Sequence, residues 1–440
     1  MARAEISDLQ SRKLRSQIRR AWQSPFYQQR FEAVGLSRDD PFQPEQLTAL
    51  PLTRKEDLCD DVAEHPPYGS RLTVEPHQVV RVVETSGTSG KGKEVHVSTR
   101  ADLERIVEME SAGFVWAGVE PGTVVAFTIP ITLTAASSYW DLALQALDAN
   151  VLRMGHLSTN EKLRYMTRYG AEVLIATPTY LGRLEHAASE IGIDPIRDLN
   201  TVRTISVAGE ARSAHWVAER QRVWGATVYE QWGCTQGVVA WSCEEGMATG
   251  GRPGILQGLP HLAIMEVVDP QEGGPVADGD YGELVITPLG VTGTPLIRFA
   301  TGDRVRFRRA EHCECGRAFD GIEAGSVSRY DDMLKVKGVN VAPPVVDALI
   351  DQRPEVLESR VTVDVDDAGR ETLTIEVEFR PETSSAARSQ VVESLTHDVR
   401  RATEIGVGVA EWKGSEALAD VVLGGTSWKA RRWRDLRRAP

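Results

Sequence analysis

The sequence has no long apolar run and no excess of positive charge. No uninterrupted apolar stretch is long enough to cross a bilayer, so we expect no membrane-spanning helix. Residues 1–5 lack an apolar core, so no secretory signal is expected. The formal net charge of −13 argues against a nucleic-acid-binding face, because phosphate contacts need concentrated Lys and Arg. We therefore expect neither a membrane nor a nucleic acid as partner.

Cysteine is also scarce, with five in 440 residues. This odd number fits a reducing, cytoplasmic location better than a disulfide framework. No solenoid-like repeat or low-complexity tract is present. The hydrophobic content of 41% is ordinary for a globular protein, and the length exceeds what one core usually supports, so two or more domains are expected.

The first two-thirds of the chain favours a sheet flanked by helices. Residues 6–34 have helical apolar spacing that is interrupted at Ser24-Pro25. Beyond them, short β-branched runs alternate with helical patterns, which predicts mixed or parallel sheets with helices on their faces. The expected strands are 79–83, 123–129, 172–176, 202–207 and 227–230, and the expected helices are 101–117, 160–169 and 179–191. Residues 262–309 predict a β-rich subdomain of short strands and turns.

A smaller α+β unit is expected after residue 328. Its predicted helices are 344–352 and 386–401, and its predicted strands are 360–366, 372–379, 407–412 and 418–423. The polar pair Asp331-Asp332 follows a turn-like Gly325-Ser326 and would suit a hinge. The predicted fold class is therefore α/β, with a large N-terminal domain at 1–329 and a small mobile C-terminal domain at 330–440.

Hydroxyl residues alternate with glycine at 85–93, after a predicted strand and before a predicted helix. Small residues let the backbone curl around an anion, and its N–H groups and hydroxyls can donate to phosphate oxygens. A flexible surface loop is the alternative. A Walker loop does not fit, because it would need Gly at Thr85 and Ser or Thr at Gly92.

Further motifs follow in a consistent order, and together they carry a family resemblance. They are Ser24-Pro25-Phe26-Tyr27, the segment 50–58, the phosphate loop, Ala208-Gly209-Glu210, the segments 229–236 and 295–303, Cys313-Glu314-Cys315-Gly316-Arg317, and the segments 329–334 and 337–341. In these motifs the chain resembles, over nearly its full length, the acyl-CoA synthetase/luciferase superfamily of adenylate-forming enzymes. Within it the chain is most similar to the phenylacetate–CoA ligase branch.

The resemblance implies a site for ATP and its AMP product. The implied binding residues are Thr85, Ser86, Gly87, Ser89, Gly90, Lys93, Gly209, Glu210, Ala211, Glu230, Gln231, Trp232, Gly233, Thr235, Asp303 and Arg329. Asp303 would accept hydrogen bonds from both ribose hydroxyls, since a carboxylate offers two acceptor oxygens. The implied catalytic residues are Thr88 in the loop and Lys429, whose charge would offset repulsion as the carboxylate approaches the α-phosphate.

The reaction implied by the resemblance has two steps. The acid attacks the α-phosphate of ATP and releases pyrophosphate, and the acyl group then passes to the thiol of CoA. For the second step the small domain would turn about Asp331 and bring Gly338 to the site, where a glycine leaves room for a pantetheine arm. A carrier-protein phosphopantetheine or an amine remains open as the acceptor, and a non-catalytic nucleotide-binding relative is a further alternative. A homodimer is a family-level expectation.

Three positions depart from the family pattern. Where the superfamily usually has a Glu that binds Mg²⁺, this chain has Gln236, which keeps an oxygen but loses the charge that a hard cation prefers. Trp428 precedes the catalytic lysine in place of Gly, and Ser328 replaces the Gly before the hinge arginine. Lys429 also belongs to a basic run at 428–437, which is either a solvated tail or a segment that meets phosphate.

Two further sites follow from the same resemblance. Cys243, Cys313 and Cys315 would hold a structural Zn²⁺ whose fourth ligand is unknown, with reduced thiols and no metal as the alternative. The acyl pocket would come from Tyr139, Trp140, Trp232 and Gly233. Aromatic walls suit an aryl acid, although the same side chains could simply fill the core.

Overall fold

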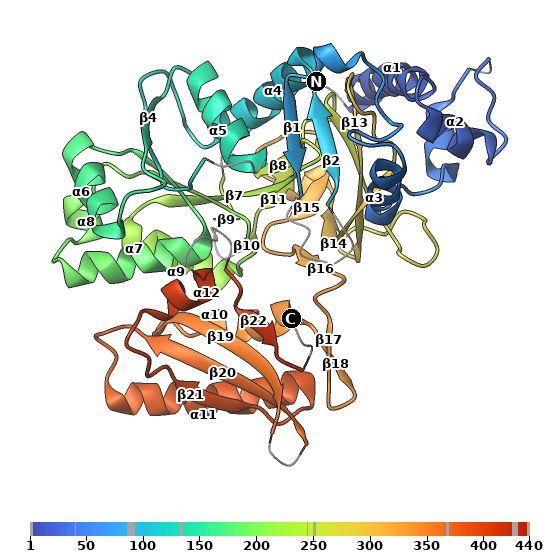
Figure 1. Cartoon of the computed structure of the whole chain (residues 1–440). Coiled ribbons are helices and arrows are strands. Elements are labelled where there is room, and N and C mark those ends of the chain that lie inside the picture. Colours follow the sequence, from blue (N-terminus) through green and yellow to red (C-terminus); the bar gives the residue numbers. More distant parts are fainter. Residues whose placement is uncertain are drawn as a thin grey trace.

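The computed structural model describes residues 3–39, 41–85, 93–131, 135–243, 245–249, 252–366, 369–424 and 430–437. Figure 1 shows a large N-terminal part and a smaller C-terminal part, each built around its own sheet. The predicted fold class, a mixed α/β large domain followed by a small α+β unit, is confirmed.

The chain begins with two helices, α1 (Arg3–Ala21) and α2 (Pro25–Glu32). The predicted break between them is confirmed, because Ser24 caps α2 by accepting from the Tyr27 N–H and Pro25 occupies its first turn. Apolar side chains of both helices form a small core with η1 (Pro44–Ala49). Helix α3 (Lys55–Glu64) and the short η2 (Pro76–Gln78) lead to the hairpin of β1 (Arg81–Glu84) and β2 (Val95–Ser98).

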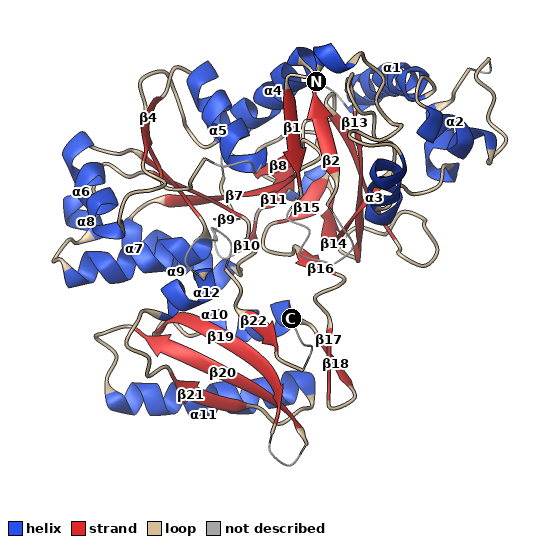
Figure 2. Cartoon of the chain, viewed as in Figure 1, coloured by secondary structure: helices blue, strands red, loops and turns tan. Residues whose placement is uncertain are grey.

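One half of the main sheet is parallel. Its strands run in the order β4 (Asn150–Arg153), β3 (Val124–Phe127), β5 (Val173–Ala176), β6 (Thr204–Ala208) and β7 (Thr227–Cys234). The connecting helices flank them, as Figure 2 shows: α4 (Arg100–Trp116), α5 (Ala135–Ala146), α6 (Thr159–Tyr169), α7 (Pro178–Glu190), α8 (Pro195–Asp198) and α9 (Ala214–Trp224). Helices on both faces explain why β5 is buried along its whole length.

The other half of the sheet is antiparallel and begins at β7. It continues through β8 (Val238–Ser242), β11 (Ile255–Gln257), β15 (Gly321–Glu323), β14 (Phe299–Arg308), β13 (Tyr281–Pro288) and β12 (Ala263–Val268), with β16 (Ser328–Arg329) on β14. A separate pair joins β9 (Ala248–Thr249) to β10 (Arg252–Pro253), and η3 (Ala310–His312) follows β14. Strands β13 and β14 are longer than the Gly-rich composition predicts, and they contain Gly282 and Gly302 within their bounds.

The small part contains a hairpin and a four-stranded sheet. The hairpin pairs β17 (Leu334–Val336) with β18 (Val339–Val341). The sheet has the order β21 (Gly408–Glu411), β20 (Glu371–Phe379), β19 (Val356–Val365) and β22 (Trp433–Asp435). Helices α10 (Pro343–Asp351) and α11 (Ser385–Thr403) contribute Val346, Ile350 and Leu395 to a core with β19 and β20.

The strand predicted at 418–423 is wrong, because these residues form helix α12 (Leu418–Leu423). Its buried residues are Leu418, Ala419, Val422 and Leu423, a spacing of one helical turn that places them on one face. Gly424 ends the helix in the left-handed conformation, at φ 63°. None of the helices in the described ranges is both long and apolar enough to cross a membrane.

Candidate functional site

Some predicted site residues lie outside the described residues. They are Ser86, Gly87, Thr88, Ser89 and Gly90 of the loop, and Lys429. The ends of the loop are described. Thr85 donates its N–H to the Glu94 carbonyl (3.1 Å) and accepts the Glu94 N–H at its hydroxyl (3.0 Å), so the β1–β2 hairpin closes the loop at its base. Lys93 is exposed and pairs with Glu84 at 3.1 Å.

Strand β7 presents its side chains to two different surroundings. The Trp232 indole donates to Asp303 Oδ2 at 3.0 Å, and the Glu230 carboxylate accepts the Gly325 N–H at 2.7 Å. Gln231, between them, points to the opposite face and donates to Glu110 of α4. Burial raises the pKa of Glu230 and of Glu110 to about 8. Both carboxyls are therefore held as neutral acids over much of the range below pH 8.

Asp303, a predicted nucleotide residue, contacts two others, Trp232 and Arg329. Strand β14 carries Asp303 and pairs with β16, where Arg329 lies opposite it. Arg329 Nη1 donates to Asp303 Oδ1 at 3.2 Å, while Trp232 occupies Oδ2. Arg329 also pairs with the predicted hinge residue Asp331 at 3.0 Å. Burial would lower the pKa of Arg329, but Asp331 and Asp303 outweigh it and raise that pKa.

The turn after β6 carries Gly209, Glu210 and Ala211. Gly209 has φ +88°, a conformation that favours glycine. Glu210 Oε2 accepts from the Thr179 hydroxyl at 2.8 Å and pairs with Arg432 Nη1 at 2.7 Å. The sequence did not identify Arg432 as a partner of this turn. The sequence indicated only that Arg432 belongs to the basic run at 428–437. In the structure its guanidinium pairs with carboxylates.

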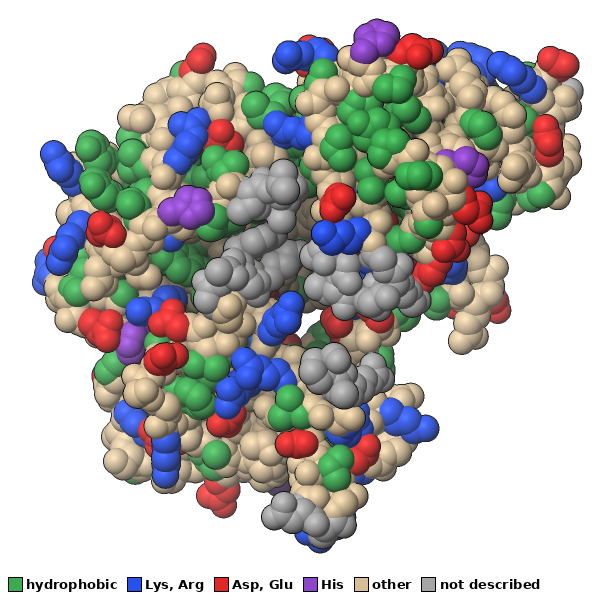
Figure 3. Space-filling view, viewed as in Figure 1, with side chains coloured by type: hydrophobic (Ala, Val, Ile, Leu, Met, Phe, Trp, Pro, Cys, Tyr) green, Lys and Arg blue, Asp and Glu red, His purple; other side chains and the backbone are tan. Residues whose placement is uncertain are grey.

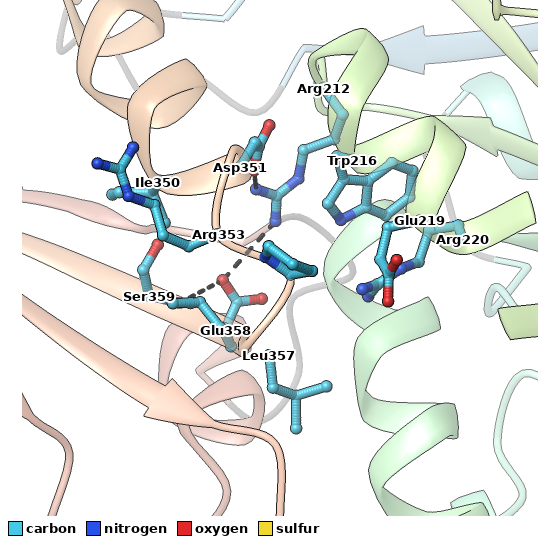
Figure 4. A pocket seen from close by; sticks show the side chains of 12 residues that line it. Arg212, Trp216, Glu219, Arg220, Ile350, Asp351, Arg353, Leu357, Glu358 and Ser359 are labelled. Carbon is cyan, nitrogen blue, oxygen red and sulfur yellow. Dashed lines mark hydrogen bonds and ion pairs between the residues drawn. The ribbon is translucent and has the colours of Figure 1, made fainter. Parts of the chain in front are cut away.

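Arg432 belongs to a polar network between the large and small parts. Its Nε lies 2.7 Å from Glu358 of β19, and Arg212 reaches the same carboxylate at 3.7 Å and Asp351 at 3.0 Å. Figure 4 shows Arg212 extending over Trp216 toward these two acids. Burial would lower the pKa of Arg432, but Glu358 and Glu210 raise it. Figure 3 shows Lys and Arg side chains where the two parts meet.

The turn after β7 contains Gly233, Thr235 and Gln236. Gln236 Nε2 lies 2.5 Å from Glu94 Oε2, and His96 Nε2 lies 3.0 Å from the same oxygen. Burial would raise the pKa of Glu94, but His96 and Gln236 outweigh it and lower that pKa. Burial lowers the pKa of His96. Sequence patterns gave no signal for Glu94 or His96, because nothing in them pairs β2 with this turn.

A pocket opens beside the same turn. Its lining includes His96, Ser98, Arg105, Tyr139, Thr235 and Gln236. Of the predicted acyl-pocket residues, Tyr139 lies here, and Gly233 is exposed on the strand next to it. Trp140 instead packs in the main core, edge-to-face with Phe127 at 6.3 Å. Successive residues of a helix point about 100° apart, so the two aromatics face different surroundings.

The three predicted cysteines lie together. Cys243 Sγ is 3.4 Å from Cys313 Sγ, which is 3.2 Å from Cys315 Sγ. His312 faces elsewhere, 2.7 Å from Asp278. Burial raises the pKa of Cys243 and Cys313, whereas backbone and thiol hydrogen bonds outweigh burial and lower that of Cys315. The described residues supply three of the four ligands that a closed zinc site needs.

Gly338 lies at the turn of the β17–β18 hairpin, at φ +83°. Its neighbour Lys337 contacts Gly406 and Glu371, both in the small part. Figure 1 shows this hairpin beside the small sheet and away from β7. The arrangement therefore groups Asp303, Trp232 and Arg329 but does not bring Gly338 to them.

Comparisons with known proteins agree on one family. Residues 28–293 match the family model described as AMP-binding enzyme. A phenylacetate-coenzyme A ligase of Aromatoleum evansii is 26% identical over 408 residues, which cover 92% of this chain and 89% of the relative. Another from Thermus thermophilus is 29% identical over 81% of this chain and 78% of its own.

A solved structure of similar fold is 2-hydroxyisobutyryl-CoA ligase in the postadenylation state with 2-HIB-AMP. It aligns at a TM-score of 0.85 and 22% identity, covering 99% of this chain and 91% of that one. The same ligase with 2-HIB-AMP and CoA in the thioesterification state aligns at 0.68 and 23% identity, covering 99% and 90%.

Proposed function

Because the chain belongs to the AMP-binding enzyme family, we propose that it activates a small aryl carboxylic acid as an acyl-adenylate and transfers the acyl group to the thiol of CoA. The observation that carries this proposal is the meeting of Trp232, Asp303 and Arg329, which come from three separate strands. The phenylacetate-coenzyme A ligases that share 26–29% identity with this chain support CoA as acceptor and an aryl acid as substrate.

Asp303 is suited to hold the ribose. Each of its oxygens already accepts one hydrogen bond, from Trp232 on one side and Arg329 on the other. A carboxylate oxygen can accept more than one hydrogen bond, so the carboxylate of Asp303 suits the two hydroxyl groups of a ribose. The two protein donors fix the plane of the carboxylate and therefore the position of the sugar.

We assign the adenylation chemistry to Lys429 and the loop that contains Thr88. The acid attacks the α-phosphate in this step, and the two groups repel each other because both are negative. A cation between them stabilises the transition state more than the ground state, because the negative charges approach only as the bond forms. A Mg²⁺ ion that accompanies ATP would supply further neutralisation of phosphate charge. Oxygen donors such as Gln236 suit such a hard cation.

The small domain at 330–440 is proposed to act as a lid that turns about Asp331. The higher TM-score to a postadenylation structure than to a thioesterification structure supports the present arrangement as the first of two. The second would need Gly338 beside the nucleotide, whereas Lys337, next to it in the β17–β18 hairpin, contacts Glu371 and Gly406 of the small domain. We further propose that Cys243, Cys313 and Cys315 hold a structural zinc ion.

Exchange of labelled pyrophosphate into ATP tests the first step. Purified protein should catalyse exchange with one or more aryl acids, tried with and without amino and hydroxyl substituents. Lys429→Ala should lower this exchange by about 100- to 1,000-fold, as loss of a group that stabilises transition-state charge does. Lys413→Ala is the control, because Lys413 is an exposed lysine of the same domain. No exchange with any acid would refute the proposal.

The acceptor is tested by offering synthetic acyl-AMP with CoA, a phosphopantetheine carrier or an amine. The acyl-CoA product should predominate by mass spectrometry. Lys429→Ala should keep most of this second step, since the lysine acts on the α-phosphate attack that synthetic acyl-AMP has already passed. Equal loss in both steps would overturn that division of roles.

A further inference from the structure

A buried carboxylate joins the base of the phosphate loop to the turn after β7. Glu94 is 4% exposed and is tied to Thr85 at the other end of the loop by two hydrogen bonds. Its Oε2 atom lies 2.5 Å from Gln236 Nε2 and 3.0 Å from His96 Nε2. Glu94 thus holds together two segments that are 142 residues apart and that both belong to the nucleotide site.

The contact fixes which way the Gln236 amide faces. An ionised carboxylate only accepts hydrogen bonds, so the amide nitrogen must point toward Glu94. His96 Nε2 must also donate to that oxygen, and the 3.4 Å approach between His96 Nε2 and Gln236 Nε2 is then a contact between two donors. The amide oxygen is left as the polar atom of Gln236 for the adjoining pocket, and no described residue donates to it.

A negative charge is thus present close to position 236, but on another strand. The carboxylate that the family resemblance would put at 236 is absent, and the nearest carboxylate is Glu94 on the far side of the amide. A carboxylate that accepts from an amide N–H draws electron density toward the amide oxygen, which then binds a hard cation more strongly. Outer carboxylates act on metal ligands in this way in many proteins.

We propose that Glu94 is a positioning residue of the nucleotide site, which orients Gln236 so that its amide oxygen faces the divalent cation of ATP. In this arrangement Glu94 supplies from β2 the negative charge that is missing at 236. The inference rests on the proposed function, because it assigns Gln236 to the cation that accompanies the nucleotide. A merely structural Glu94 would affect the midpoint of thermal unfolding and leave the affinity for the cation unchanged.

A charge-swap cycle tests the proposal with Glu94→Gln, Gln236→Glu and the double variant. Binding of Mn²⁺ in the presence of a non-hydrolysable ATP analogue is measured by calorimetry, and the midpoint of thermal unfolding is measured without nucleotide. Glu94→Gln should weaken Mn²⁺ binding by roughly 10- to 100-fold, the usual effect of losing an outer partner of a metal ligand. Gln236→Glu should lower the unfolding midpoint, because two carboxylates then face each other at a buried site.

The Mn²⁺ affinity of Glu94→Gln distinguishes the proposal from a structural role, and the double variant tests whether that affinity follows the charge of the pair. It returns one carboxylate and one amide to the pair, so its Mn²⁺ affinity should recover to within about threefold of the wild type and its unfolding midpoint should rise above that of Gln236→Glu. Glu104→Gln removes the same charge from an exposed position of α4 and should change neither quantity. Unchanged Mn²⁺ affinity in Glu94→Gln would overturn the proposal, as would a double variant no better than Glu94→Gln.

These outcomes are separable from the proposed function. Pyrophosphate exchange by the wild type tests the ligase reaction and needs none of the variants. Exchange by the wild type together with normal Mn²⁺ binding by Glu94→Gln would remove the role of Glu94 and leave the ligase. Absence of exchange, with the charge-swap pattern intact, would remove the ligase and leave a metal-nucleotide site.

Discussion

The centre of the large sheet and the junction between the two parts are both buried, but the first consists of apolar side chains and the second of charged ones. In β5, four consecutive apolar residues, Val173–Ala176, are at most 2% exposed. At the junction, Arg212, Glu358 and Arg432 are between 3% and 9% exposed, and all carry charge. The sheet centre is held by apolar burial, and the junction is held by paired ions.

The difference indicates which region can come apart. Separating apolar layers exposes them to water at about 25 cal/mol per Å² of surface. Separating paired ions returns them to water, which solvates them well, so much of the lost attraction is recovered. A junction of ions can therefore form and break during a catalytic cycle, provided that each charge has its partner when the junction is closed.

Removing Arg432 should have the largest effect on the paired charges of the junction. Arg432→Met leaves Glu210 and Glu358 buried without their shared cation, and breaking a buried pair in this way costs about 3–5 kcal/mol. Adenylation, measured by pyrophosphate exchange, should fall about 100-fold or more, while thioester formation from synthetic acyl-AMP falls much less. Arg434→Met is the control, because the Arg434 side chain donates to the Val421 carbonyl within the small domain. Equal losses in both steps would show that Arg432 merely stabilises the fold.

A cavity in the sheet should have the contrasting effect. Leu174→Ala removes a fully buried side chain from β5, and such changes destabilise by about 2–5 kcal/mol. Both half-reactions should decline together with the midpoint of urea unfolding, because this part of the core must stay intact in each. Ile196→Ala, at a side chain that is 56% exposed, should change stability by about 0.5 kcal/mol or less. Loss of adenylation alone in Leu174→Ala would contradict the comparison.

The neutral carboxyl of Glu110 is an exception inside the apolar region. The folded pKa is about 8 and the ordinary value is 4.5, so between these values the unfolded chain binds fewer protons and stability falls as the pH rises. The contribution of Glu110 to the free energy of unfolding is fully present below pH 4.5. Between pH 5 and pH 7, Glu110→Gln should reduce the loss of unfolding free energy by no more than ~3 kcal/mol, because each pH unit contributes about 1.4 kcal/mol. Urea unfolding at both pH values measures it, and an unchanged slope would contradict the assignment. Glu104→Gln serves as control.

The smallest effect is expected at the rim of the junction. Arg183 of α7 pairs with Asp420 of α12 at 2.9 Å, and the Asp420 side chain is 45% exposed. Exposed pairs contribute about 0–1 kcal/mol, so Asp420→Asn should leave adenylation within about threefold of the wild type. A loss as large as that of Arg432→Met would show that the rim, and not the buried ions, controls docking.

Local patterns predicted much of the fold and part of the site. The Ser24-Pro25 break and the alternation of strands and helices follow from capping and periodicity, which act within a few residues. Helix α12 was missed because six residues with apolar ends fit a short strand as well as a short helix. Trp140 was assigned to the pocket beside Tyr139 because adjacency in sequence does not reveal which helix face meets the core.

The pairings that distinguish this chain could not be read from its sequence. Arg432 with Glu210 and Glu94 with Gln236 each join segments far apart in the chain, and nothing local identifies the partner. The sequence showed that Gln236 lacks a charge, but it could not show that Glu94 lies next to it. Only the packing of β2 against the turn after β7 brings that carboxylate into place.

Strand β22 has a consequence for synthesis of the protein. It pairs with β19 through Val361 and Trp433. The edge of β19 therefore stays unpaired until residues about 70 positions later in the chain have been made. On the ribosome, the strands of the large sheet are all made before this edge strand of the small sheet and before Arg432. The ion pairs that Arg432 makes with Glu210 and Glu358 can therefore form only when synthesis of the chain is almost complete.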